Sequence, residues 1–409
     1  MNTVVKKVTV PILSLFVFTL SNGLVTTLIS IRLHHNGASS MLVGAMMSIY
    51  YFGFICGSFR TEKFIIKVGH IRAFATFASF LTIFSLLQGL FFAEWFWLLL
   101  RFLSGIATAG IFVVIEAWLL VLSSTKTRGR ILAFYMIALY AAQAMGQFLI
   151  NIADITTMIP FVIAATLSAF AIIPLAMLKV IQPQIEEPSA LSFIKLYQAS
   201  GSGMIGCLAS GIVLGAAYGL LPIFLTEQTH NTYYVSLLMS ALIFGGMTLQ
   251  YPVGKLSDII ERRLVLIFIS FLLIIISLAL LFNHLYNLAL FTTFIFLFGG
   301  LTFTLYPLSI TLACDNLNTK DIISGTQGLS LAYGVGATTG PLIAPFFIRI
   351  FGNSGLMIYF AIVGVVLVLF FLYRRSKKPA VGQEVTFIPI PQTTPITAEL
   401  NSTEENKTT

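Results

Sequence analysis

The charged and polar side chains most able to bind a solute or a proton lie within one apolar stretch, residues 95 to 121. Five of its side chains recur at intervals of three, four, four and four residues, which places them on one face of a helix: Arg101, Ser104, Thr108, Phe112 and Glu116. A face that carries charge cannot contact lipid, so this one must face protein or a water-filled cavity. Arg101 and Glu116 are separated by roughly 22 Å along such a helix, and they therefore cannot pair with each other.

That stretch is one of twelve, which together make up most of the chain. Hydrophobic residues form 57% of the sequence and charged residues 9%, whereas a soluble domain carries about 25% charged residues. Each stretch approaches the roughly 20 apolar residues that cross a bilayer as a helix. We therefore predict an all-α membrane protein with twelve transmembrane helices, near residues 8 to 30, 41 to 59, 71 to 92, 95 to 121, 131 to 152, 158 to 178, 202 to 225, 234 to 253, 264 to 282, 288 to 314, 325 to 350 and 355 to 373.

The basic residues predict the orientation of these helices. If both termini are cytosolic, 20 of the 23 Lys and Arg residues lie in cytosolic segments, Arg32 and Arg349 lie outside, and Arg101 lies within the membrane. The net charge of +8 then lies against anionic lipid, so the expected partner is the bilayer and not nucleic acid. We expect a multi-pass protein of a bacterial inner membrane.

The short basic loop after the second stretch reappears after the eighth. A Gly at the helix end permits a tight turn, and the acid and bases that follow can pair across helices on the cytosolic side. The first copy contains Gly57, Glu62, Lys63, Gly69 and Arg72, and the second contains Gly254, Asp258 and Arg262. This repeat predicts a duplicated membrane transporter.

The longest internal polar loop divides the twelve stretches into six and six. We predict two six-helix halves, residues 1–178 and 201–373, joined by a cytosolic linker at 179–200. Residues 374–409 are rich in Pro and Thr, and their few large apolar residues are chiefly Phe387, Ile388 and Ile390, so we expect a disordered cytosolic tail.

Short motifs distributed along the chain carry a family resemblance. They are Lys67-Val-Gly69-His70-Ile-Arg72, Arg128-Gly129-Arg130, Tyr135-Met136, Gly146-Gln147, Ser210-Gly-Ile-Val-Leu-Gly215, Tyr218-Gly219, Tyr251-Pro252-Val-Gly254-Lys-Leu-Ser-Asp258, Leu305-Tyr306-Pro307 and Gly336-x-x-x-Gly340-Pro341. In these the chain resembles the YcaD-type subgroup of the major facilitator superfamily, from the first helix to Tyr373.

The resemblance implies a substrate site between the two halves near the membrane midplane, lined by the first, fourth, seventh and tenth helices. It also implies that the paired basic loops form a conformational latch that stabilises the outward-facing state. Polar residues in these helices and in the fifth are candidates for the substrate and proton pathway: Asn22, Thr108, Gln147, Tyr218 and Tyr306. Such hydroxyls and amides are as often contacts between helices as ligands.

Arg101 and Glu116 each have more than one interpretation. Arg101, in the outer half of its span, either binds an anionic group of the substrate or responds to a nearby proton site, and the cost of burying Arg favours a functional role over a structural one. Glu116 is the only carboxylate well inside a predicted span, yet it lies toward the cytosolic end. It either carries a proton or pairs with the basic loop at 60 to 72.

The sequence favours a carrier over an enzyme. It shows no constellation of catalytic residues, no metal-ligand spacing, no cofactor motif and no phosphate-binding loop, so a gradient must supply the energy. We predict a monomeric secondary active transporter of a small organic solute, linked to protons, with export favoured over import. A non-transporting sensor or receptor with the same fold is the main alternative, and a passive channel or a lipid-flipping protein is a third.

Overall fold

The apolar stretches form helices in the computed structural model. It describes residues 2–123, 127–177, 193–282, 287–317, 322–377, 387 and 389–394, so residues 179–192 of the expected linker and most of the tail lie outside the described residues. Within these ranges every regular element is helical: α1 (Asn2–His35), α2 (Ser40–Val68), α3 (His70–Leu90), α4 (Glu94–Leu122), α5 (Arg128–Phe148), η1 (Leu149–Ile152), α6 (Ile159–Phe170), α7 (Ile172–Ala176), α8 (Phe193–Thr229), α9 (Thr232–Ile259), α10 (Arg262–Leu280), α11 (Leu288–Cys314), α12 (Ile322–Phe351), η4 (Gly352–Ser354) and α13 (Gly355–Lys377).

These helices provide the twelve expected membrane crossings. In the described part of the chain, eleven helical stretches are long and apolar enough to span a bilayer, and the last of them, Ser324–Lys377, is 54 residues long and holds both α12 and α13. Helices α6 and α7 together form one crossing, Ile159–Ala176. The predicted all-α fold is confirmed.

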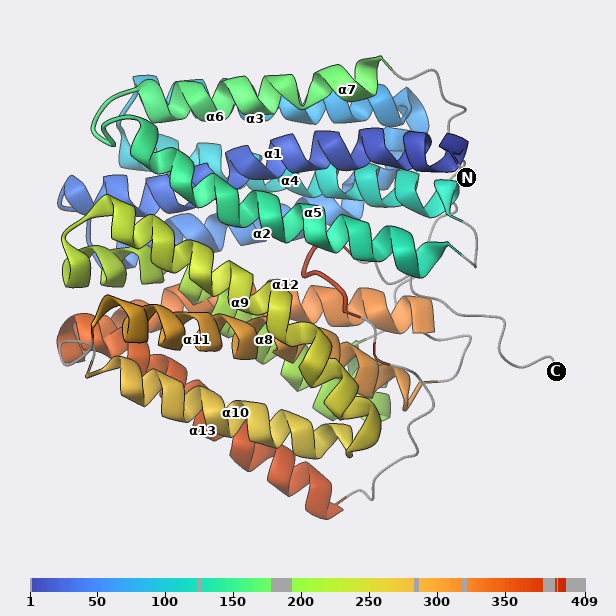
Figure 1. Cartoon of the computed structure of the whole chain (residues 1–409), viewed down its shortest axis with the longest axis vertical. Coiled ribbons are helices and arrows are strands. Elements are labelled where there is room, and N and C mark those ends of the chain that lie inside the picture. Colours follow the sequence, from blue (N-terminus) through green and yellow to red (C-terminus); the bar gives the residue numbers. More distant parts are fainter. Residues whose placement is uncertain are drawn as a thin grey trace.

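The packing of the helices repeats between the two groups. In the first group α1 packs on α5, α2 on α4 and α3 on α6, and in the second α8 packs on α12, α9 on α11 and α10 on α13. Across the interface α2 packs on α12 and α5 on α9. Figure 1 shows the two groups one above the other, α1 to α7 in blue to green and α8 to α13 in yellow-green to red.

The two ends of the bundle differ. One end, which we call the basic end, holds the N-terminus of α1, the C-terminus of α13 and the turns between α2 and α3 and between α9 and α10, and it lies on the right in Figure 1. The basic stretches 60–72 and 254–263, expected as loops, are therefore mostly helical. At the other end the two groups touch. There the Asn151 side chain donates a hydrogen bond to Ser236 Oγ (2.7 Å), and a Cβ added to Gly44 of α2 would lie 2.1 Å from the Pro341 carbonyl oxygen of α12.

Local sequence features explain where several helices begin and end. The side chains of Ser39, Asn231 and Asn287 accept backbone N–H bonds at the starts of α2, α9 and α11, where the first turn has no carbonyl partner. Between α2 and α3 the backbone of Gly69 has φ of 85°, which a residue with a Cβ rarely adopts, so Gly69 permits the tight turn predicted there.

Candidate functional site: a cavity between the two halves

A cavity of about 230 Å³ lies between the two groups of helices and extends toward the basic end. Aromatic and neutral polar side chains dominate its wall, which contains no charged side chain among the described residues. The groups that a solute would meet include Tyr50, Tyr51, Tyr140, Tyr218 and Tyr333, the amides of Asn22, Gln143 and Gln327, and the hydroxyls of Thr26 and Ser330. A wall of this kind suits an uncharged molecule with an apolar face and a few polar groups.

Two of the predicted pathway residues line this cavity directly. Asn22 of α1 accepts a hydrogen bond from the Tyr50 hydroxyl (3.4 Å). Tyr218 of α8 faces it from the other half, with its ring edge-on to Phe303 at 6.1 Å between centroids. The wall thus joins residues about 200 positions apart in the chain.

Tyr306 and Gln147 lie behind the wall. The hydroxyl groups of Tyr306 and Ser330 are 2.8 Å apart, and the Tyr306 ring meets Tyr333 edge-on. Gln147 is buried between α1 and α5, where it accepts a hydrogen bond from Thr27 Oγ1 (2.5 Å) and donates one to the Gly23 carbonyl (3.2 Å). In this conformation Gln147 therefore joins two helices.

Arg101 and Thr108 line a second, smaller cavity of about 20 Å³ inside the N-terminal half. The Arg101 guanidinium is buried, lies 4.0 Å above the centre of the Tyr50 ring and donates a weak bond to Met47 Sδ (3.5 Å). A guanidinium on an aromatic face away from water is stabilised by about 2 kcal/mol. Arg101 thus contacts the back of two residues of the main cavity wall, Tyr50 and Met47, and is not itself part of that wall.

Glu116 is fully buried nearer the basic end. One carboxylate oxygen accepts a hydrogen bond from the Tyr135 hydroxyl of α5 (2.5 Å), and the other accepts one from the hydroxyl of Thr394. Thr394 belongs to the tail, a partner that no helical spacing indicates. Lys63 and Arg72, the partners considered from sequence, have exposed side chains.

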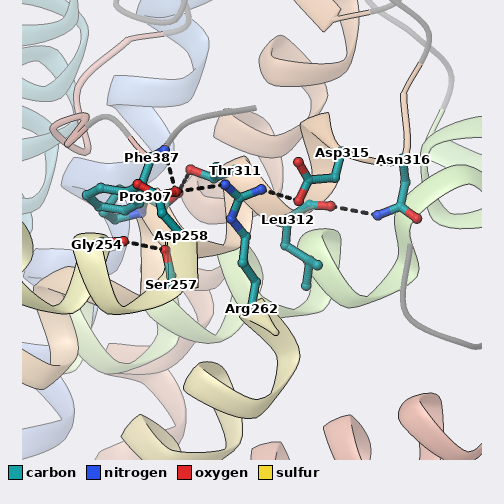
Figure 2. Close-up of polar contacts among 10 residues, drawn as sticks. All are labelled: Gly254, Ser257, Asp258, Arg262, Pro307, Thr311, Leu312, Asp315, Asn316 and Phe387. Atoms are coloured by element: carbon teal, nitrogen blue, oxygen red, sulfur yellow. Dashed lines mark hydrogen bonds and ion pairs between the residues drawn. The ribbon is translucent and has the colours of Figure 1, made fainter. Parts of the chain in front are cut away.

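The second copy of the repeated loop brings its acid and base together. Arg262, buried at the start of α10, bonds to Asp258 (3.0 Å) and to Asp315 at the end of α11. Figure 2 shows Arg262 between the two carboxylates, with the Phe387 N–H donating to Asp258 Oδ1 (2.9 Å). A Cβ added to Gly254 would lie 2.0 Å from the Phe387 ring, so Gly254 provides the space for it.

The first copy is arranged differently. Gly57 lies within α2, where a Cβ would come 2.7 Å from the Ile106 carbonyl oxygen of α4, so its role is close helix packing. The side chains of Lys63 and Arg72 are exposed, and that of Glu62 lies outside the described residues. The two copies, alike in sequence, therefore have different surroundings in this conformation.

Sequence reasoning missed two contributions to these sites. Asp315 follows an apolar helix as a single acid, and only tertiary packing brings it to Arg262. Phe387 and residues 389–394, which we call the tail segment, lie between the two halves, and Gln392 and Thr393 form part of the cavity wall. The apolar residues Phe387 and Ile390, both buried, were the only sequence signal that this part of the tail is packed.

Comparison with known proteins finds a matching family and similar sequences. The family model described as Major Facilitator Superfamily matches residues 12–328 and 203–396. The MFS-type transporter YcaD of Escherichia coli O17:K52:H18 is 31% identical over 384 residues, which cover 93% of this chain and 98% of the relative. YcaD of Shigella dysenteriae serotype 1 matches to the same extent.

Solved structures share the fold at lower identity. A mutant of the nucleoside transporter NupG superposes with a TM-score of 0.75 at 16% identity, over 90% of this chain and 99% of NupG. A bacterial homologue of the human lysosomal transporter Spinster, in an inward-facing and occupied conformation, superposes with a TM-score of 0.71 at 13% identity, over 91% of this chain and 98% of that one.

Proposed function

This chain belongs to the Major Facilitator Superfamily, and from that premise we propose that it is a proton-linked exporter of a small, uncharged organic solute. Membership makes it a multi-pass membrane transporter and not an enzyme.

The observation that carries the proposal is the cavity between the halves. Its volume of about 230 Å³ suits a small molecule, and residues of both halves line it, so movement of one half against the other would change access to it. Since its wall is aromatic and neutral, we propose an uncharged solute that presents a flat apolar face and hydrogen-bonding groups. Asn22 and Tyr218 are the residues we expect to contact it.

The remaining predicted residues are proposed to hold the wall in place. Arg101 would position Tyr50 from behind, with Thr108 beside it in the smaller cavity. Tyr306 would position Tyr333 and Ser330 in the same way. Gln147 would keep α1 against α5. These are positioning roles, and an anionic substrate group at Arg101 is not part of the proposal.

The direction in which the cavity extends indicates which side of the membrane this conformation faces. The excess of Lys and Arg at the basic end favours placing that end, with both termini, in the cytosol. The halves touch at the opposite end, so the route to the cavity in this conformation leads through the basic end, the side from which an exporter would load its solute. Asp258, Arg262 and Asp315 bond within one half in this conformation, so the proposed latch would stabilise the outward-facing state only after these contacts rearrange.

Proton coupling is assigned to Glu116. It is a buried carboxylate beside the cavity wall, held by the hydroxyl of Tyr135. Protonation would remove its charge and change the hydrogen bonds that it can accept, which gives the protonated and ionised forms different preferences for the two access states.

Comparative metabolite profiling of cells that lack and cells that overproduce the protein tests the function. We expect one class of uncharged solute to be enriched in the medium of the overproducing cells. Purified protein in vesicles should then move that solute against its gradient when a pH difference is imposed. Enrichment inside the cells would identify an importer, and the absence of any solute change or proton flux would refute transport.

A further inference from the structure

The mouth of the cavity at the basic end is lined by two residues of the tail segment (Phe387 and residues 389–394), namely Gln392 and Thr393. Resting on the proposed function above, we propose that this mouth is a binding site for an extended peptide, and that its ligand is the chain's own tail segment. While bound, the segment excludes solute from the cavity and holds the two halves together.

Gln392 is the central contact of this site. Its side-chain oxygen accepts a hydrogen bond from the Tyr140 hydroxyl of α5 (3.3 Å), and its amide nitrogen donates one to the Phe303 carbonyl of α11 (3.0 Å). Tyr140 and Phe303 belong to different halves, and their rings also meet edge-on at 5.6 Å between centroids. A single side chain of the tail therefore bridges the halves that must separate or rotate during transport.

The two ends of the segment contact the two acidic sites. At one end the Phe387 N–H donates to Asp258, and its ring covers Gly254. At the other end Thr394, which is 2% exposed, donates to Glu116. The hydroxyl of Thr393 lies 3.3 Å from that of Tyr135, whose single proton is donated to Glu116, so Thr393 can donate to the Tyr135 oxygen. The segment thus reaches from the latch to the proposed proton site.

The sequence of the segment suits binding in an extended form. Pro389 and Pro391 flank Ile390, which is 2% exposed. Proline restricts its own backbone and that of the residue before it to extended conformations, and it removes backbone donors that would need partners in an apolar mouth. A peptide that is already extended loses less conformational entropy when it binds.

Binding of the tail segment in the mouth of the cavity has two consequences for transport. Gln392 and Thr393 take up part of the wall that a solute would contact, so solute and segment compete. Thr394 covers Glu116, so a proton exchanges with the carboxylate only after the segment leaves. Release of the segment would thus be required both for loading and for the change of access.

Accessibility of a single cysteine in the full-length protein tests the site without any solute. Thr393→Cys, close to Thr in size, is reacted in detergent with a hydrophilic maleimide and compared with Thr403→Cys, a matched Thr farther along the tail. Labelling of Cys56, Cys207 and Cys314 in the unaltered chain is subtracted. We expect Thr393→Cys to react about tenfold more slowly than Thr403→Cys. The reason is that position 393 can react only in those molecules whose tail segment has left the mouth of the cavity. Ile390→Cys should show the same protection.

A competing peptide then tests whether the segment is an exchangeable ligand. Excess synthetic peptide with the sequence of residues 386–396 should raise the labelling rate of Thr393→Cys toward that of Thr403→Cys, and a scrambled peptide should not. Adding Gln392→Ala to Thr393→Cys should have the same effect as the peptide. Equal labelling of positions 393, 390 and 403 would overturn the proposal, as would protection that neither peptide nor Gln392→Ala relieves. These outcomes do not depend on solute or protons, so they are separate from failure of the proposed transport function.

Discussion

Replacing Glu116 by Gln tests the proton-coupling proposal directly. The substitution keeps the shape of the side chain but removes the group that can bind and release a proton. Two of its hydrogen bonds are accepted from the hydroxyls of Tyr135 and Thr394. With Gln one of them becomes neutral and the other must reverse, because the amide nitrogen donates, which weakens the pair by roughly 2 kcal/mol in total. The free-energy cost of burying a charge is removed at the same time, and this offsets part of the lost hydrogen-bond energy. The protein should therefore still fold and insert.

The expected effect on transport follows from one carboxyl group carrying one proton per cycle. One pH unit is worth about 1.4 kcal/mol per proton, the free energy of about a tenfold concentration ratio. In vesicles with a pH difference of one unit, the unaltered protein should therefore sustain about a tenfold gradient of an uncharged solute. Glu116→Gln should sustain none, while downhill exchange of the solute continues.

Asp154→Asn is the matched control for this experiment. Asp154 lies in the exposed loop before α6, where the backbone N–H and the hydroxyl of Thr156 donate to its carboxylate (both 2.8 Å) and hold its pKa below the usual value. It therefore stays ionised near neutral pH, so its replacement should leave the gradient unchanged. Normal pH-driven accumulation by Glu116→Gln would refute the assignment. Equal slowing of uphill and downhill movement would instead indicate a structural role for Glu116.

Three further substitutions test the other assignments. Asp258→Asn removes a partly exposed charge that bonds Arg262, so it should shift the equilibrium between the two access states by about tenfold. Turnover should fall sharply while expression stays intact, and unchanged transport kinetics would refute the latch. Arg101→Lys keeps the charge but loses the planar contact with Tyr50, and we expect up to roughly a tenfold rise in KM with insertion unaffected. Gly105→Ala places a methyl group 2.0 Å from the Tyr50 carbonyl oxygen and should lower stability in detergent by about 1–3 kcal/mol, whereas Gly129→Ala, which meets nothing within 4 Å, should not.

Much of the fold could be predicted because a bilayer imposes its own rules on sequence. Helix length follows bilayer thickness, and backbone groups in lipid must bond within the helix, so each apolar stretch could be predicted to be a helix. The boundaries were less predictable. Helix α8 begins at Phe193, nine residues before the predicted stretch, and turns at Ser200, whose backbone has φ of −141° and ψ of 71°. The polar residues there can continue a helix beyond the lipid, and hydropathy does not detect them.

The site was predictable as a set of residues but not as a set of contacts. The spacing on α4 showed that Arg101 and Glu116 face inward, and both are buried. Their partners come from distant parts of the chain. Tyr50 contacts Arg101 from α2, and Thr394 reaches Glu116 from a position 278 residues away, so no local pattern indicates either pair.

The tail was expected to be disordered because its composition cannot form a core of its own. The tail segment instead uses the cavity as its core, where Phe387 and Ile390 are buried. Burial of two such side chains contributes about 3–6 kcal/mol. Among the hydrogen bonds of its described residues, the five with Asp258, Tyr140, the Phe303 carbonyl, Tyr135 and Glu116 contribute about 1 kcal/mol each. Ordering its seven described residues costs roughly 7–14 kcal/mol, toward the lower end where Pro has already restricted the backbone.

The free energy gained from burial and hydrogen bonds nearly equals the entropic cost of ordering the tail segment. A segment with such a balance can leave the mouth of the cavity. A segment bound by many kcal/mol would close the carrier permanently, and one without the contacts of Gln392 would not compete with solute. Because the contacts end on Asp258 and Glu116, a change at either acid should alter occupancy of the mouth as well as its own step. Asp258→Asn and Glu116→Gln should therefore each raise the labelling rate of Thr393→Cys, even in protein that has no solute to transport. A rate unchanged by both substitutions would show that the tail and the two acids act independently.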